Sequence, residues 1–258
     1  MDDESFSLLV PAELDAIHAL KGEIGRHVLS VMETVVLVEQ SFKILGAVKV
    51  AETTLSGKVV LNLLIRLGND LRSIVVLAGI GMPMQAVSLA AGSFETAYAL
   101  AYIAADDSRA QAWVDHDDPT KPFLPVRKLV AEVMVHLFGE ANEERVEHHY
   151  RHYRQLCLAK HGNPLLARQH GATFDGEGIV LALGPNTSDV GVRALQFALE
   201  HSLGHSLLAL GVLANVDPLL GANADFAREV ERLNQIWSDL HQEALRRWGG
   251  EDPCKGRW

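Results

Sequence analysis

An uncharged stretch of the chain, from Ser73 to Phe94, constrains its fold more than any other feature. By count it is long enough to span a bilayer, for which about 20 apolar residues suffice. However, Gly79, Gly81 and Pro83 interrupt it near its middle, and proline inside a helix removes a backbone hydrogen bond. We therefore expect the end of one buried helix, a tight turn and the start of the next helix, and no membrane span.

Helical signals continue along most of the chain, while helical periodicity is lost in one stretch, residues 173–185. There an apolar run follows Asp175-Gly176-Glu177-Gly178, which is typical of a hairpin turn or an extended crossover. The predicted fold class is therefore all-α (mainly α): a bundle of long antiparallel helices with at most one small β-hairpin near residues 173–185. The expected helices cover residues 11–50, 54–77, 83–105, 106–113, 125–138, 142–161, 189–215 and 224–248.

The domain organisation follows from length and composition. With 258 residues, of which 48% are hydrophobic, the chain can bury a sizeable core in one large domain. No repeat and no Ser/Pro-rich linker divides it. We expect a single helical-bundle domain over residues 1–248, followed by a flexible C-terminal tail over residues 249–258.

Charge and cysteine usage limit the compartment and the partners. The net charge of −10 favours solubility and disfavours a broad surface that coats nucleic acid, because phosphate binding needs clustered Lys and Arg. A local basic groove remains compatible with this charge. Cys157 and Cys254 form neither a disulfide framework nor a zinc ligand set, and the acidic residues after Met1 are unlike a secretory signal. We expect a cytoplasmic protein that does not enter a membrane.

Glu95 is the one charged residue between Ser73 and Ala105. A buried carboxylate needs a cationic or hydrogen-bonding partner. Arg66 is the candidate, because Arg66 and Asp70 lie one turn apart on a helix stripe that is expected to face the core. This cluster either fixes the register of the helices or supports a functional site.

Histidines are concentrated between His136 and His170. His148 and His152 have the i,i+4 spacing that can hold one Zn²⁺, with Glu144 one turn earlier as a third ligand. A solvated polar face explains the same spacing more simply. The pair of His201 and His205 repeats it in an apolar helix, where core histidines are the simpler interpretation. We therefore expect no metal and no cofactor.

Another stripe of the His-rich helix carries Tyr150, Arg154, Cys157 and His161, which step by four, three and four residues. It places a permanent cation and a titratable imidazole on one side of the helix. Arginine can neutralise phosphate and histidine can move a proton, which are the minimum requirements for cleaving RNA without a metal through its 2′-hydroxyl. We take Arg154 and His161 as candidate catalytic residues.

Short motifs between Thr54 and Pro164 resemble the HEPN superfamily of helical proteins, which includes abortive-infection proteins. Toxins of that superfamily carry an Arg, four to six residues and then a His near the end of a long helix, and Arg154 and His161 match the long form. The residue after the Arg, Gln155, departs from the Asn, Asp or His common in the family. The motifs that carry the resemblance are Arg66-x-x-x-Asp70, Ser93-Phe94-Glu95, Tyr153-Arg154-Gln155-Leu156-Cys157 and His161-Gly162-Asn163-Pro164.

The resemblance implies a metal-independent endoribonuclease or RNA-binding protein of a defence or toxin–antitoxin system. His161 would be its acid/base group and Arg154 its phosphate-binding group, in a cleft between the two copies of a homodimer. An antitoxin-like protein is the further partner that it implies. Tyr150, Tyr153, Arg66, Asp70 and Glu95 would support this site. A non-catalytic helical interaction module is the alternative, and a metal site at His148, His152 and Glu144 is the weaker one.

Overall fold

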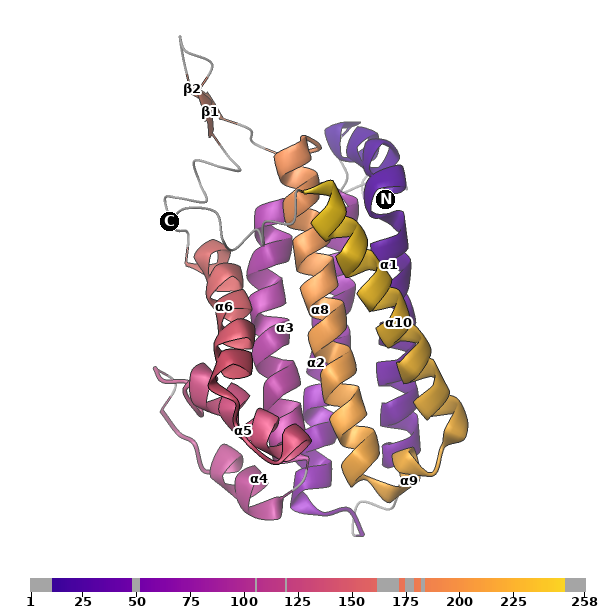
Figure 1. Cartoon of the computed structure of the whole chain (residues 1–258), viewed down its shortest axis with the longest axis vertical. Coiled ribbons are helices and arrows are strands. Elements are labelled where there is room, and N and C mark those ends of the chain that lie inside the picture. Colours follow the sequence, from indigo (N-terminus) through magenta and orange to yellow (C-terminus); the bar gives the residue numbers. More distant parts are fainter. Residues whose placement is uncertain are drawn as a thin grey trace, which may run out of the picture.

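The computed structural model of the chain describes residues 11–47, 52–104, 106–118, 120–161, 172–174, 179–181 and 184–248. This part of the chain confirms an all-α bundle (Figure 1). The expected C-terminal tail, residues 249–258, lies outside the described residues. The helices are α1 (Pro11–Gly46), α2 (Leu55–Gly79), α3 (Pro83–Ile103), α4 (Asp107–Val114), α5 (Val126–Phe138), α6 (Glu143–Lys160), α8 (Asp189–Val216), α9 (Pro218–Gly221) and α10 (Ala224–Arg247).

Capping residues explain why most of these helices start where they do. The side chains of Thr54, Asp106, Asn142 and Ser188 each accept a hydrogen bond from a backbone N–H in the first turn of α2, α4, α6 and α8, respectively. Each cap satisfies a donor that the helix itself leaves unpaired. At the C-terminal end of α5, Gly139 has φ of 77°, a left-handed conformation that glycine adopts without steric penalty. These local signals fix the lengths of the helices.

The uncharged stretch forms the turn that its sequence predicts. Helix α2 ends at Gly79, Gly81 has φ of 78°, and α3 begins at Pro83. A Cβ atom on Gly81 would lie 3.0 Å from Pro185 Cβ and 3.2 Å from Ala16 Cβ. A glycine is needed here both for the backbone conformation and for the close approach of these neighbours.

The same contacts show that α1, α3 and α8 begin at one end of the bundle. Helices α1, α2 and α3 alternate in direction, as expected for antiparallel neighbours, whereas α8 runs parallel to α3 (Figure 1). This is possible because α6 lies antiparallel along α3 and returns the chain to the end at which α3 starts. The parallel pair of α3 and α8, with α6 beside them, positions the residues discussed below.

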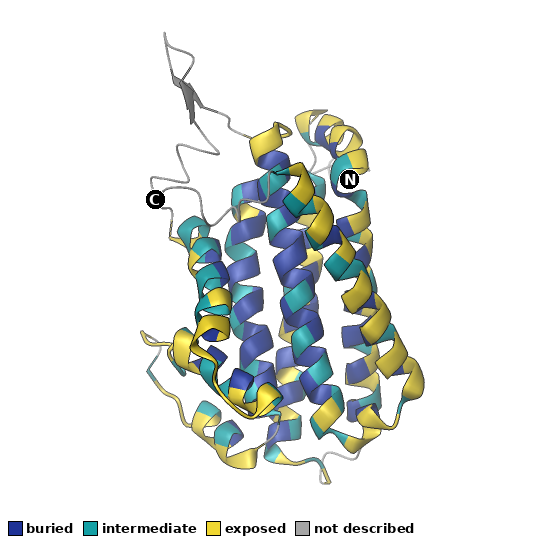
Figure 2. Ribbon diagram, viewed as in Figure 1, coloured by how far each residue is buried: buried dark blue, intermediate teal, exposed yellow. Residues whose placement is uncertain are grey.

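The core lies between α1, α2, α3 and α8, which pack against one another in a ring. Figure 2 shows that α3 and α8 are mostly buried, whereas α10 presents a largely exposed outer face. Leu64, Leu67, Leu71 and Ile74 of α2 are fully buried, and each such side chain contributes about 1.5–3 kcal/mol by leaving water. All of the described helices supply residues to this one hydrophobic core.

Helix α8 is the one described helix with the length and composition of a membrane span. However, 72% of its most apolar window is buried inside the bundle. Packing against α1, α3 and α10 therefore accounts for its apolar character. The cytoplasmic location remains a prediction.

The expected hairpin is present as two short strands, β1 (Ala172–Phe174) and β2 (Ile179–Leu181). They pair antiparallel, with Thr173 opposite Val180. The Asp-Gly-rich segment between them, residues 175–178, lies outside the described residues. Among the described residues they are the only strands, so the mainly α prediction holds.

Candidate functional site

Helix α6 carries most of the residues that the sequence singled out. Its buried side chains are Val146, His152 and Leu156, spaced so that they share one face. That face packs against α3 and α5. The remaining polar residues of α6 lie at its edges or in solvent, so the helix has one buried face and one exposed face.

Arg154 and His161 lie at the exposed side of α6, near its C-terminal end. His161 is the C-cap residue, and its backbone N–H donates to the carbonyl of Cys157 at 3.0 Å. Within the described part of the chain, the Arg154 guanidinium has no hydrogen bond and no ion pair. Residues seven apart differ by only about 20° around a helix axis. A cation and an imidazole are therefore both accessible on the same side of α6.

The two tyrosines of the predicted site lie side by side along the same helix. Tyr150 and Tyr153 are partly buried, with ring centroids 6.1 Å apart. The Tyr153 ring also lies 5.2 Å from the Phe94 ring on α3. Burial raises the pKa of Tyr153 well above its usual value, and its hydrogen bonds to Cys157 and Glu95 add to this. Tyr153 is thus a neutral hydrogen-bond donor and not a base.

Glu95 has a cationic partner, as expected, but the partner is not Arg66. Lys160 Nζ donates to Glu95 Oε1 at 2.8 Å, and the Tyr153 hydroxyl donates to the same oxygen at 2.7 Å. The Glu95 side chain is 32% exposed, so the expectation of a buried carboxylate was wrong. The polar tips of Lys160 and Glu95 meet at the edge of the α3–α6 contact, where water reaches them. This network fixes the end of α6 and leaves Arg154 out of it.

The expected cluster of Arg66 with Glu95 does not form. The Arg66 side chain is 60% exposed, and its Nε lies 3.8 Å from Asp70 Oδ2 on the same helix. Arg66 lies one turn after the buried Leu63, at the edge of the buried face of α2. The long side chain of Arg66 therefore extends into solvent. Burial raises the pKa of Asp70, while Arg66 partly opposes this effect. Arg66 and Asp70 therefore form a local pair on α2, in which Arg66 is exposed and the Asp70 side chain is mostly buried, at 19% exposed.

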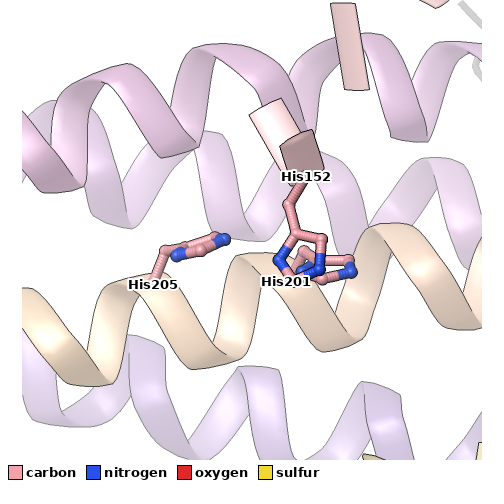
Figure 3. Close-up of side chains that lie close together, drawn as sticks. All are labelled: His152, His201 and His205. Carbon is pink, nitrogen blue, oxygen red and sulfur yellow. The ribbon is translucent and has the colours of Figure 1, made fainter. Parts of the chain in front are cut away.

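On the buried face of α6, His152 meets two histidines of α8. The side chains of His152, His201 and His205 are 8%, 7% and 6% exposed. Figure 3 shows the His152 ring above His201, with the His205 ring one turn away along α8. One ring nitrogen from each residue can be chosen so that all three lie within 4.8 Å of one another. We refer to these three residues as the histidine cluster.

Aromatic side chains enclose the histidine cluster. The Phe94 ring lies 4.4 Å from the His205 ring, and the Phe197 ring lies 4.2 Å from the His201 ring. Next to them, the Tyr98 hydroxyl and His149 Nδ1 are hydrogen-bonded at 2.8 Å. The Nε2 atom of His205 is buried without a hydrogen-bond partner in the described part of the chain. The rings around His205 are those of Phe94 and Tyr98 and of the three histidines His149, His152 and His201.

Burial sets the charge state of these histidines. It lowers the pKa of both His201 and His205 well below the usual value, and the neighbouring imidazoles lower it further. Burial also lowers the pKa of His149 to about 4. The rings of His149, His201 and His205 are therefore neutral near pH 7, and a neutral imidazole has one nitrogen with a lone pair.

The ligand set considered from the sequence is only partly assembled. The rings of His148 and His152 lie 4.3 Å apart, as their spacing predicts, but Glu144 and His148 are exposed. The sequence predicts His201 and His205 as a separate core pair, whereas in the structure both lie next to His152. The sequence shows the i,i+4 spacing of the histidines within α6 and within α8. Which residues of the two helices meet depends on the tertiary fold.

Comparisons with known proteins add no family to this geometry: no family model, curated protein or solved structure matches the chain. The resemblance to the HEPN superfamily therefore remains a prediction that rests on the short motifs alone. A functional proposal for this chain therefore rests on the positions and chemistry of its residues.

Proposed function

We propose that the protein cleaves RNA without a metal ion, through Arg154 and His161 at the end of α6. One observation carries this proposal: an exposed guanidinium, without a partner among the described residues, shares a helix side with an exposed imidazole. An arginine already held by carboxylates would have little left to offer a phosphate. Here Glu95 is engaged by Tyr153 and Lys160, so Arg154 is available.

The chemistry requires one proton transfer and one charged contact. His161 in its neutral form takes the proton of the 2′-hydroxyl, whose oxygen forms a bond to the adjacent phosphorus. The bond from phosphorus to the 5′-oxygen breaks, that oxygen leaves with a proton from water, and the hydroxide so formed takes the proton from His161. Arg154 stabilises the negative charge that grows on the phosphoryl oxygens. The products are a 2′,3′-cyclic phosphate and a 5′-hydroxyl.

The overall charge of −10 makes this a local contact with RNA and not a broad binding surface. The resemblance places the cleft between the two copies of a homodimer, and we include that arrangement in the proposal. Mixing inactive Arg154→Ala with inactive His161→Ala protein should then restore part of the activity, because some mixed dimers combine an intact Arg154 with an intact His161. An antitoxin-like partner would act by covering this end of α6.

The experiment is incubation of purified, tag-free protein with total RNA in EDTA. The wild type, His161→Ala and Arg154→Ala are compared at equal thermal stability, with Arg145→Ala as a control that removes another exposed arginine from α6. We expect cleavage with cyclic phosphate ends by the wild type and the control, and a loss of at least about 100-fold in the other two variants. Undiminished cleavage by His161→Ala would eliminate the mechanism.

A non-catalytic interaction module is the second candidate, and exposed apolar residues favour it. Leu29, Met32 and Val36 lie on the exposed side of α1 at helical spacing, a pattern typical of surfaces that bind another protein. Absence of RNA cleavage by any form, together with stable binding of a second chain that Leu29→Lys prevents, would support this candidate.

A further inference from the structure

We infer that His152, His201 and His205 bind one divalent transition metal ion of the zinc type. The inference is independent of the proposed cleavage of RNA. Neutral imidazole is a preferred ligand of Zn²⁺, Co²⁺, Ni²⁺ and Cu²⁺. Each histidine offers one ring nitrogen, and the three nitrogens already lie within 4.8 Å of one another (Figure 3).

The geometry is close to what such an ion requires. With bonds of about 2.0–2.1 Å at tetrahedral angles, ligand nitrogens are separated by about 3.3 Å. Small rotations of the three side chains would close the difference, because the rings of His152 and His201 are already 4.3 Å apart. His201 and His205 are one turn apart on α8, the i,i+4 arrangement that places two imidazoles on one ion. His152 approaches them from α6.

The burial of these rings gives a second, independent reason. Buried polar atoms are almost always hydrogen-bonded, and an exception needs an explanation. The Nε2 atom of His205 is such an exception, in a side chain that is only 6% exposed. The adjacent Phe94 ring has no polar atom to offer it, and the Tyr98 hydroxyl is already hydrogen-bonded to His149. A metal ion bound to the ring would account for both the orphan nitrogen and the gathering of three imidazoles.

Three protein ligands leave the fourth position of a tetrahedral ion for water or for another side chain. His148 is the neighbour with suitable chemistry, since its ring lies 4.3 Å from that of His152 and it is exposed. Glu144, the ligand considered from the sequence, is exposed in the first turn of α6 and has no part in the buried set.

The ion would also hold α6 in place. Only three of its side chains are buried, those of Val146, His152 and Leu156, so a further bond to the core would add to a small buried contact. A bond from His152 through the metal to α8 would tie it to the core. Metal binding should therefore slow backbone amide exchange in α6 more than in α10, which carries none of the three ligands.

The test is titration of metal-free, tag-free protein with Co²⁺ and Zn²⁺, followed by visible absorption for Co²⁺ and by calorimetry for both ions. We expect one ion per chain, with the absorption bands of tetrahedral cobalt. His205→Leu and His201→Leu should weaken binding by at least about 100-fold, since even the loss of a supporting residue costs 10–100-fold. Zn²⁺ should raise the melting temperature of the wild type but not of these variants.

Two matched variants make the result specific. His27 on α1 is equally buried and also has an orphan Nε2, so His27→Leu tests the effect of removing a buried histidine outside the cluster. Glu144→Ala tests the exposed ligand set. Both should bind Zn²⁺ like the wild type. Absence of binding by the wild type would overturn the inference, as would binding that survives His205→Leu and His201→Leu but is lost in Glu144→Ala.

Discussion

The buried face and the exposed face of α6 differ in whether water can hydrogen-bond to their polar side chains. On the buried face, His152 packs among His201, His205 and aromatic rings, and a polar atom there must find a partner or destabilise the fold. At the exposed end, water satisfies Arg154 and His161 whatever their role. The buried histidines are therefore tested by metal titration, and the exposed pair by an assay of RNA cleavage.

The contact between α3 and α6 joins these two faces. Phe94 touches both His205, with ring centroids 4.4 Å apart, and Tyr153, with centroids 5.2 Å apart. Tyr153 in turn donates to Glu95, which also binds Lys160 at the end of α6. The comparison can be tested by weakening each of these contacts in turn.

The largest effect is expected from Phe94→Ala. Phe94 is 1% exposed and stacks on Tyr98, with centroids 4.4 Å apart, so its loss leaves a cavity in the α3, α6 and α8 contact. We expect a decrease of about 3–5 kcal/mol in the free energy of unfolding, measured by urea denaturation. The exposed Phe138 on α5 provides the control, and Phe138→Ala should cost less than about 1 kcal/mol. Equal losses in the two variants would contradict the location of the core.

Acid should destabilise the metal-free protein through its buried histidines. The pKa of His27 and that of His149 are each lowered to about 4 from 6.5 by burial. Between these values the unfolded chain binds more protons than the folded one, so stability is full above pH 6.5 and is lost as pH falls towards 4. For His27 alone the loss is about 3 kcal/mol, since each pKa unit is worth about 1.4 kcal/mol.

The measurement is urea unfolding at a series of pH values, compared between His27→Gln and His18→Gln. Because His18 is exposed, its substitution should leave the slope of stability against pH unchanged, whereas His27→Gln should reduce it between pH 6.5 and 4. A wild-type protein whose stability rises on acidification through this range would show that the buried rings are charged in the folded state.

A smaller effect is expected from Tyr153→Phe, which removes the hydrogen bond to Glu95 and keeps the ring that packs on Phe94. The loss should be about 1–1.5 kcal/mol in the free energy of unfolding. Tyr150→Phe is the control, because its hydroxyl makes no hydrogen bond within the described residues and its loss should change stability by less than about 0.5 kcal/mol. A larger loss of stability in Tyr150→Phe than in Tyr153→Phe would contradict the role of the Tyr153 hydroxyl as the donor to Glu95.

Much of the fold could be predicted from the sequence because its signals are local. The turn at Gly81 and Pro83, the stop at Gly139 and the start of α6 at Asn142 each depend on the chemistry of one or two residues. The short helix α9 was missed, because Pro218 and Gly221 indicate a break in the sequence and yet also fit a single capped turn. The parallel direction of α8 was missed as well, because it depends on α6 returning the chain to the end of the bundle at which α3 starts.

The candidate site could be predicted from the sequence only for residues that lie on the same helix. Arg154 and His161 share a side of α6 as their spacing requires, and both are exposed. The partner of Glu95 is Lys160 and not Arg66, because the register between α3 and α6 decides which cation is near. The histidine cluster requires the contact of α6 with α8, which no spacing within either helix reveals.

The most direct test is an end-group analysis of RNA treated with metal-free protein in EDTA, comparing wild type, His161→Ala and His205→Leu. The account predicts 2′,3′-cyclic phosphate ends from the wild type and from His205→Leu, and none from His161→Ala, because the exposed end of α6 acts without the buried cluster. Equal cleavage by the wild type and His161→Ala, or its loss in His205→Leu alone at unchanged thermal stability, would contradict the account.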